Sequence, residues 1–221
     1  MASPGGNAPA FNRRGVIEMK RQIVAISGGG FSAQPDAFID EFIINLRKAD
    51  RKVNIAFVAS ASNDAQGYID KFYTAFQHEN PSHLTIADLA SNTIQESVNA
   101  LDILYVGGGS TQDLLGVWRQ TGFDDVLKNA YHNGVLLCGI SAGAMCWFEH
   151  CFTERRDGNY EELEGLGLVE GAFCPHYEDP ERKEHFDAWA EQQVTSPIYK
   201  LYDNESLYLE NGIVRAKLSA K

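Results

Sequence analysis

The stretch Val135-Leu136-Leu137-Cys138-Gly139-Ile140-Ser141-Ala142-Gly143 joins a short apolar run to a serine enclosed by two glycines. Four consecutive apolar residues that end at glycine are typical of a strand buried on both faces, and the residues after Gly143 are compatible with a helix. Strand, sharp turn and helix form the context in which G-x-S-x-G indicates a nucleophile elbow. We therefore predict that Ser141 is a catalytic nucleophile on a strained turn.

The glycines of this motif have a steric reason. Side chains at 139 and 143 would collide with the neighbouring strand and helix, so glycine suits both positions. The amide of Ala142 then points to the place where a carbonyl oxygen of a substrate would lie, and the start of the new helix favours negative charge there. The alternative reading is a glycine-rich turn that merely contains a serine, but the flanking elements favour the functional one.

The same alternation of strand and helix patterns extends away from this motif toward the N-terminus. Short apolar runs predict strands at 23–26, 53–58, 84–86, 103–106 and 135–138. Apolar residues at three- and four-residue spacing predict helices at 38–46, 68–76, 94–101, 111–119 and 124–133. Because each parallel strand needs a crossover connection, this order predicts an α/β fold with a parallel, doubly wound sheet.

The patterns are weaker in the C-terminal part. We predict a charged surface excursion at 153–165, a strand at 172–174 and a long helix at 180–194. Three β-segments follow, at 198–202, 206–209 and 213–218. The last two segments flank Asn211-Gly212, which favours a tight hairpin turn. Residues 1–20 are rich in Ala, Gly and Pro and are predicted to be a disordered tail, which leaves 21–221 as one domain.

Composition narrows the function classes. The chain has 221 residues and a formal net charge of −11, from 19 Lys and Arg against 30 Asp and Glu. This charge argues against binding to nucleic acid or to an anionic membrane, where affinity comes largely from neutralising phosphates. No run approaches the ~18 apolar residues of a membrane span. Four cysteines without a C-x-x-C pair favour a reducing compartment, so we predict a cytoplasmic protein.

A serine hydroxyl is a weak nucleophile unless a base accepts its proton. His176 is the strongest candidate because it follows the predicted strand at 172–174, and parallel strands end at the edge where such sites assemble. His150 would lie about 13 Å from Ser141 if one helix continued between them. The other histidines fit helix ends, loops or exposed helix positions: His78, His83, His132 and His185.

A carboxylate should orient the imidazole of the base. Asp203 follows the predicted strand at 198–202 and is our first choice, with Glu205 as its close rival; Asp179 and Asp187 remain open alternatives. The resulting order is serine, histidine, acid. In α/β-hydrolases the acid precedes the histidine, so this order excludes that fold.

The loop Gly107-Gly108-Gly109 follows another predicted strand and offers a second backbone donor for an oxyanion, with Gly109 as the candidate. A phosphate-binding loop is the rival interpretation, but neither this loop nor Gly28-Gly29-Gly30 fits a nucleotide-binding pattern. Cys138 and Cys146 flank the elbow without occupying it, so we expect small buried hydrophobes there. No cluster has the spacing of metal ligands, so we predict no metal and no cofactor.

Three motifs together carry a resemblance to a known family. Val106-Gly107-Gly108-Gly109-Ser110-Thr111, then Gly139-Ile140-Ser141-Ala142-Gly143-Ala144, then Pro175-His176-Tyr177 closely resemble dipeptidase E, the α-aspartyl dipeptidases, with the cyanophycinases as more distant relatives. The resemblance spans roughly residues 22–218. It implies a flavodoxin-like three-layer sandwich similar to class I glutamine amidotransferases, with a mostly parallel central sheet and a serine in place of their cysteine.

The resemblance also implies roles and a substrate. Carried over, Ser141 would be the nucleophile and His176 the base; Asp203 would be the third member, and Gly109 and Ala142 the oxyanion amides. The implied reaction is hydrolysis of dipeptides with an N-terminal aspartate, without a metal, by a monomer or homodimer. Alternatives are β-aspartyl peptides, cyanophycin-like peptides or small esters as substrates, or a non-catalytic binding module. Candidate cations for an acidic substrate are Arg182 and Arg119, with Arg155 and Arg156 also considered.

Overall fold

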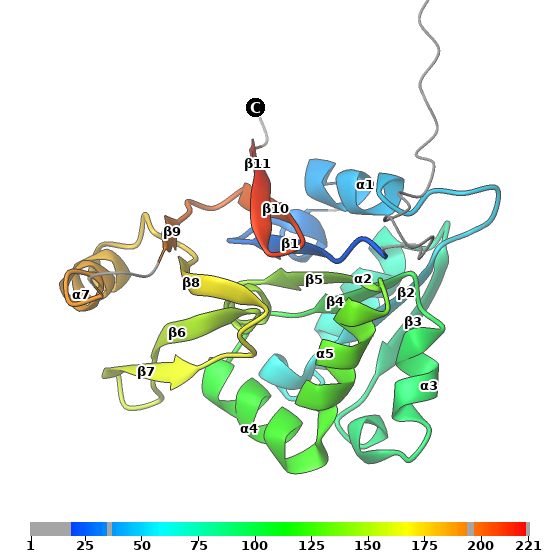
Figure 1. Cartoon of the computed structure of the whole chain (residues 1–221), viewed down its shortest axis with the longest axis horizontal. Coiled ribbons are helices and arrows are strands. Elements are labelled where there is room, and N and C mark those ends of the chain that lie inside the picture. Colours follow the sequence, from blue (N-terminus) through cyan, green and yellow to red (C-terminus); the bar gives the residue numbers. More distant parts are fainter. Residues whose placement is uncertain (1–18, 35–36, 194–196, 220–221) are drawn as a thin grey trace, which may run out of the picture.

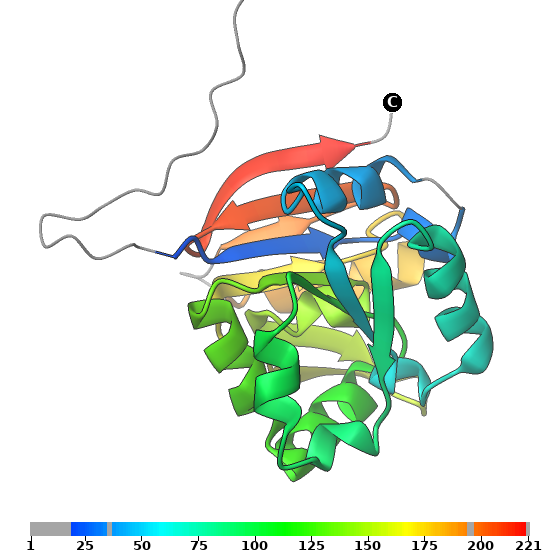
Figure 2. The same ribbon diagram turned by 90° about the vertical axis from the view of Figure 1, so that its right-hand side faces the viewer.

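The computed structural model describes residues 19–34, 37–193 and 197–219. Its central seven-stranded sheet has the order β11-β10-β1-β5-β4-β2-β3. Five strands are parallel: β1 (Gln22–Ile26), β2 (Asn54–Val58), β3 (Asn80–Leu84), β4 (Ile103–Val106) and β5 (Leu136–Ile140). Two C-terminal strands, β10 (Glu205–Glu210) and β11 (Ile213–Ser219), extend the sheet antiparallel beyond β1 (Figure 2). The fold class predicted from the sequence is confirmed.

Helices cover both faces of this sheet (Figure 1). One face packs on α1 (Phe38–Asn45) and α2 (Gln66–Ala75); the other packs on α3 (Ile94–Asn99), α4 (Thr111–Thr121) and α5 (Phe123–His132). Alternate residues of β1 serve the two layers, since Ile23 and Ala25 join one apolar cluster while Val24 and Ile26 join the other. Strands buried on both faces explain the unbroken apolar runs. Three single-turn helices lie in the connections: η1 (Gly30–Ser32), η2 (Ser60–Ser62) and η3 (Asp88–Ala90).

A second, four-stranded sheet lies beside the first and has the order β7-β6-β8-β9. Its elements are β6 (Phe148–Glu154), β7 (Tyr160–Glu164), β8 (Val169–Cys174) and β9 (Ile198–Lys200), with α7 (Pro180–Ala190) connecting the last two. The predicted surface excursion at 153–165 does lie mostly at the surface, but it is not irregular, because β6 and β7 pair there as an antiparallel hairpin. Only Tyr160 and Leu163 of β7 pack against apolar clusters, so its three glutamates made the segment look like a loop.

Other boundaries also differ from the predictions. The third strand begins at Asn80 and contains Pro81, which an edge strand tolerates. The helix after Ser141, α6 (Ala142–Met145), has only four residues, so His150 lies on β6 and not on that helix. Helix α7 ends at Ala190, while residues 194–196 lie outside the described part of the chain. Residues 1–18 also lie outside it, so the expected tail stays a prediction.

Asp40 is a buried carboxyl group beneath the loop after β1. Its side chain is 6% exposed, and neither of its oxygens, nor the hydroxyl of Tyr105, has a hydrogen-bond partner among the residues described. A Cβ built on Gly30 would lie 3.2 Å from the Tyr105 hydroxyl and 3.5 Å from Asp40 Oδ1. Burial raises the pKa of Asp40 to about 7. The folded protein therefore retains a proton that an unfolded aspartate releases near pH 4.

We expect Asp40→Asn to stabilise the protein more at pH 8 than at pH 5. Because the pKa is raised in the folded state, the stabilising effect of the proton is complete below pH ~4 and is lost as the pH rises through about 7. The free-energy difference between variant and wild type should grow by ~2 kcal/mol between these pH values. Urea unfolding at both pH values measures it; a difference independent of pH would contradict the assigned titration.

Candidate active site

Three adjacent strands of the central sheet end at the same edge, because β5 lies between β1 and β4 and all three are parallel. Their loops are Ser27–Gly30 after β1, Gly107–Gly109 after β4, and Ser141 after β5. A Cβ built on Gly108 would lie 3.2 Å from the Cβ of Ser141, so two of these loops are in contact. Crevices at the carboxyl ends of parallel strands are where ligands bind in such folds.

The turn at Ser141 has the expected strain. Ser141 has φ 55° and ψ −115°, a conformation that L-residues rarely adopt. A Cβ on Gly139 would lie 1.9 Å from the carbonyl oxygen of Gly143, and one on Gly143 would lie 2.4 Å from that of Val106. Glycine is therefore required at both positions for the reason given from the sequence. The amide of Ser141 donates to the carbonyl of Ile26 at 2.9 Å, which ties the turn to β1.

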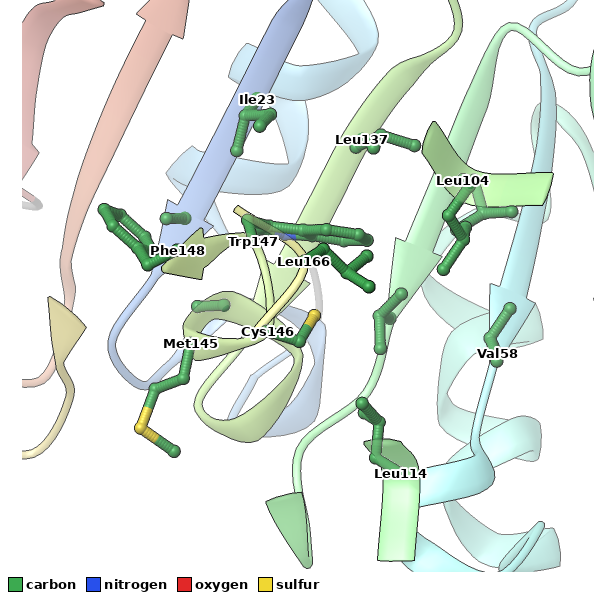
Figure 3. Packing of buried hydrophobic residues seen from close by; sticks show 14 of the residues in the cluster. Ile23, Val58, Leu104, Leu114, Leu137, Met145, Cys146, Trp147, Phe148 and Leu166 are labelled. Carbon is green, nitrogen blue, oxygen red and sulfur yellow. The ribbon is translucent and has the colours of Figure 1, made fainter. Parts of the chain in front are cut away.

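Apolar packing beneath the turn keeps it rigid. Figure 3 shows Trp147, which follows α6, beside Leu137 and Leu104 of the central sheet. The indole of Trp147 is fully buried in this cluster, as are Leu137 of β5 and Leu104 of β4. A packed interior of this kind fixes side-chain positions, because small displacements lose many contacts at once. The strained serine is therefore supported by core packing from below.

His176 and Asp203 meet Ser141 from the second sheet. The Nε2 atom of His176 lies 2.9 Å from Ser141 Oγ, and its Nδ1 atom lies 2.6 Å from Asp203 Oδ1. The two residues come from parallel neighbours: β8 leads to His176 and β9 leads to Asp203, with Cys174 opposite Lys200 in the register. His176 is held at φ 54°, a second strained backbone in this site. The structure thus brings the three predicted residues into one hydrogen-bonded chain.

The other carboxylates considered from the sequence have different partners. Glu205 accepts a hydrogen bond from the amide of Tyr202 at 2.8 Å and pairs with Lys217 at 2.7 Å. Asp179 caps α7 by accepting from the amide of Arg182 at 2.9 Å. Asp187 contacts three side chains at 2.7–2.9 Å: Tyr177, Lys183 and Lys200. Although partial burial opposes it, hydrogen bonding to these groups lowers the pKa of Asp187 to about 2.

The loop after β4 leaves one backbone amide as the oxyanion candidate. The amide of Gly108 donates to the hydroxyl of Tyr68 at 3.3 Å, so it is already engaged. Gly109 has φ 142°, and a Cβ there would lie 2.2 Å from the carbonyl oxygen of Ala61, so the position requires glycine. On the other side, Ala142 is the first residue of α6 and directly follows Ser141. Both predicted amides therefore belong to segments that flank the hydroxyl.

The two arginines predicted to bind substrate occupy different places. Arg182 lies in the first turn of α7, its guanidinium carbon 6.0 Å from the ring centre of Tyr160. Its Nη1 atom is buried and has no hydrogen-bond partner within the described part of the chain. Arg119 instead donates to the carbonyl of Glu164 and lies about 12 Å along α4 from its first residue, Thr111. The structure does not bring Arg119 to the triad.

The remaining arginine candidates are engaged in ion pairs at the β6–β7 hairpin. Arg155 lies 3.4 Å from Asp157 and 3.6 Å from Glu161, and Arg156 lies 2.7 Å from Asp113. Exposed pairs of this kind contribute little to stability. Of the four arginines considered from the sequence, Arg182 is the one with a buried side-chain nitrogen that has no hydrogen-bond partner among the described residues.

All four cysteines are free and buried. Burial raises the pKa of every thiol, to about 12 for Cys151 and Cys174 and well above its ordinary value for Cys138 and Cys146. Thiols of this kind are not thiolate nucleophiles at neutral pH. Within residues 19–34, 37–193 and 197–219, no group of three His, Cys, Asp or Glu side chains is arranged to hold a metal ion. The helices in the same ranges are all too short or too polar to span a bilayer.

The sequence reasoning missed the loop after β1. A Cβ on Gly28 would lie 2.1 Å from Asp203 Oδ1 and 3.0 Å from His176 Cε1, so only glycine allows the histidine–aspartate pair to lie where it does. The amide of Asn204 donates to the carbonyl of Gly28 at 3.0 Å, next to Asp203. The signal was Gly28-Gly29-Gly30, which the sequence analysis tested only as a phosphate loop.

The protein is an α/β protein with the side-chain arrangement of a serine hydrolase. A strained serine at a strand-to-helix turn lies with a histidine and an aspartate at one edge of a mostly parallel sheet. Comparison with known proteins agrees, since the profile of peptidase family S51 matches residues 23–217. The chain belongs to peptidase family S51.

Individual relatives extend this finding. The chain is 39% identical over 205 residues to the uncharacterized peptidase YgaJ of Bacillus subtilis (strain 168), an alignment that covers 91% of this chain and 88% of YgaJ. Two crystal structures share the fold. A proposed peptidase E protein from Listeria monocytogenes EGD-e has a TM-score of 0.66 at 19% identity, covering 91% of this chain and 100% of that one. A peptidase from an acI-B1 Actinobacterium has a TM-score of 0.65 at 17% identity, covering 92% and 96%.

Proposed function

We propose that this S51 peptidase hydrolyses dipeptides with an N-terminal aspartate through an acyl-enzyme on Ser141. The observation that carries the proposal is the continuous chain Ser141 Oγ, His176 imidazole, Asp203 carboxylate, with heavy-atom distances of 2.9 and 2.6 Å. Both distances lie in the range that direct proton transfer and imidazole orientation need.

In the proposed mechanism, Ser141 Oγ attacks the carbonyl carbon of the scissile amide while its proton passes to His176 Nε2. Asp203 accepts the hydrogen bond from His176 Nδ1 and stabilises the imidazolium that forms. The negative oxygen of the tetrahedral intermediate receives hydrogen bonds from the amides of Gly109 and Ala142. His176 then gives its proton to the leaving amine, and the C–N bond breaks. Water repeats the sequence on the ester, which releases aspartate and regenerates the hydroxyl.

The aspartate specificity rests on Arg182. Its Nη1 atom is buried without a hydrogen-bond partner among the described residues, and a buried unpaired charge is costly unless a ligand pairs with it. A carboxylate matches a guanidinium, which can donate two parallel hydrogen bonds to it. Arg182 also lies six residues after His176 along the chain, in the first turn of α7. Burial raises the pKa of the Cys174 thiol, and the nearby charge of Arg182 opposes that effect. The side-chain carboxylate of an N-terminal aspartate is therefore the group we assign to Arg182.

A panel of uncharged and charged substrates tests this assignment. We expect kcat/KM for Asp-Leu to exceed that for Asn-Leu by at least ~10²-fold, because the amide cannot replace the charge-assisted pair. Arg182→Gln should remove most of this ratio and leave hydrolysis of p-nitrophenyl acetate within ~3-fold of wild type. The matched control is Arg119→Gln, which should change neither the Asp-Leu to Asn-Leu ratio nor the hydrolysis of p-nitrophenyl acetate. Equal rates on Asp-Leu and Asn-Leu would contradict the specificity; faster hydrolysis of β-Asp-Leu would favour the isopeptide alternative.

A further inference from the structure

Ser27 is a completely buried serine at the end of β1, and both capacities of its hydroxyl are used. Its Oγ accepts a hydrogen bond from the backbone amide of His176 at 2.8 Å. The same hydroxyl donates to the backbone carbonyl of Leu201 at 3.0 Å, two residues before Asp203. One side chain thus joins the central sheet to the two loops of the second sheet that carry the histidine and the acid.

The neighbours of Ser27 complete a set of contacts to the whole triad. Ile26, on its N-terminal side, accepts the amide of Ser141 at 2.9 Å. Gly28, on its C-terminal side, accepts the amide of Asn204 at 3.0 Å and lies directly against the Asp203 carboxylate. The amide of Ser27 itself donates to the carbonyl of Glu205 at 3.0 Å. Three consecutive residues therefore hold the backbones of all three triad segments in register.

The conformation of His176 makes the Ser27 contact more than a generic hydrogen bond. His176 has φ 54°, and a left-handed backbone in a non-glycine residue persists only where the surroundings enforce it. Without the Ser27 hydroxyl, the amide of His176 would lose its acceptor in a partly buried site. The residue could then relax toward negative φ and turn its imidazole away from Ser141. Proton transfer depends steeply on such displacements, since a shift of ~1 Å can cost ~10²-fold in rate.

We infer that Ser27 is a positioning residue of this active site, holding His176 and Asp203 in line with Ser141 through backbone hydrogen bonds. The inference rests on the proposed function, because it assumes that the triad performs the reaction. A role in stability alone makes a different prediction: it would lower the fraction of folded protein but leave each folded molecule fully active.

The test compares wild type with Ser27→Ala and with Ser206→Ala, a control on the neighbouring strand β10. Ser206 is also buried, at 2% exposed, and pairs with Ile26 in the register. Two rates are measured and normalised to folded protein: kcat for Asp-Leu, and the rate constant for labelling of Ser141 by a fluorophosphonate probe. We expect Ser27→Ala to lower both by ~10–100-fold with KM within ~3-fold of wild type, and Ser206→Ala to change neither.

Unchanged rates per folded molecule in Ser27→Ala would overturn the inference, whatever the loss of stability. If that variant does not fold, Ser27→Cys replaces it under the same criterion, because a thiol is a weaker acceptor and donor of similar shape. Failure of the proposed function has a separate signature. In that case the wild-type protein would not be labelled at Ser141, whereas failure of the inference leaves wild type and Ser27→Ala labelled equally fast.

Discussion

Ser141→Ala should lower kcat by at least ~10⁴-fold and leave KM and the folded structure close to wild type. The covalent step needs the hydroxyl, and removing the nucleophile of a serine triad abolishes nearly all of the rate that the triad provides. Alanine should fit the turn, although it must keep the φ of 55° that Ser141 holds. Progress curves with Asp-Leu, together with circular dichroism of the variant, measure the effect.

The same variant separates an enzyme from a non-catalytic binding module. A fluorophosphonate should increase the mass of the wild-type protein by that of one bound probe and leave the mass of Ser141→Ala unchanged, because the probe reacts with an activated serine. The control is Ser206→Ala, which keeps Ser141 and should be labelled as fast as wild type. Turnover that survives in Ser141→Ala would assign the reaction to another group, and a wild-type protein that is neither labelled nor active would favour the binding module.

The sequence predicted the position of the triad better than it predicted the second sheet. Ser141, His176 and Asp203 each follow a strand, and parallel strands expose their carboxyl ends along shared edges, so local patterns were enough to suggest that they meet. The hairpin at 153–165 lacked such a pattern. Its second strand, Tyr160–Glu164, carries three glutamates and one leucine, so its strand conformation comes from backbone pairing with β6 and not from its own hydrophobicity.

The role of Ser27 could not be read from local sequence at all. Its hydroxyl contacts residues 149 and 174 positions away along the chain, and a serine followed by glycines has no distinctive periodicity. Likewise, the sequence left Arg119 and Arg182 equivalent. They differ because one lies near the end of α4 and the other in the first turn of α7. The strand pairing in the two sheets determines which side chains meet at the site.

Substituting the two rival acids, Asp203 and Glu205, should have very different effects on kcat. Asp203→Asn should lower kcat by ~10⁴-fold, because the amide cannot stabilise the imidazolium and favours the wrong tautomer of His176. Glu205→Gln removes a carboxylate two residues away that pairs with Lys217, so its kcat should stay within ~3-fold of wild type. The two substitutions are matched in chemistry, and steady-state kinetics on Asp-Leu compares them directly. The opposite ranking would transfer the orienting role to Glu205 and would require a different position of the imidazole from the one that places Nδ1 2.6 Å from Asp203.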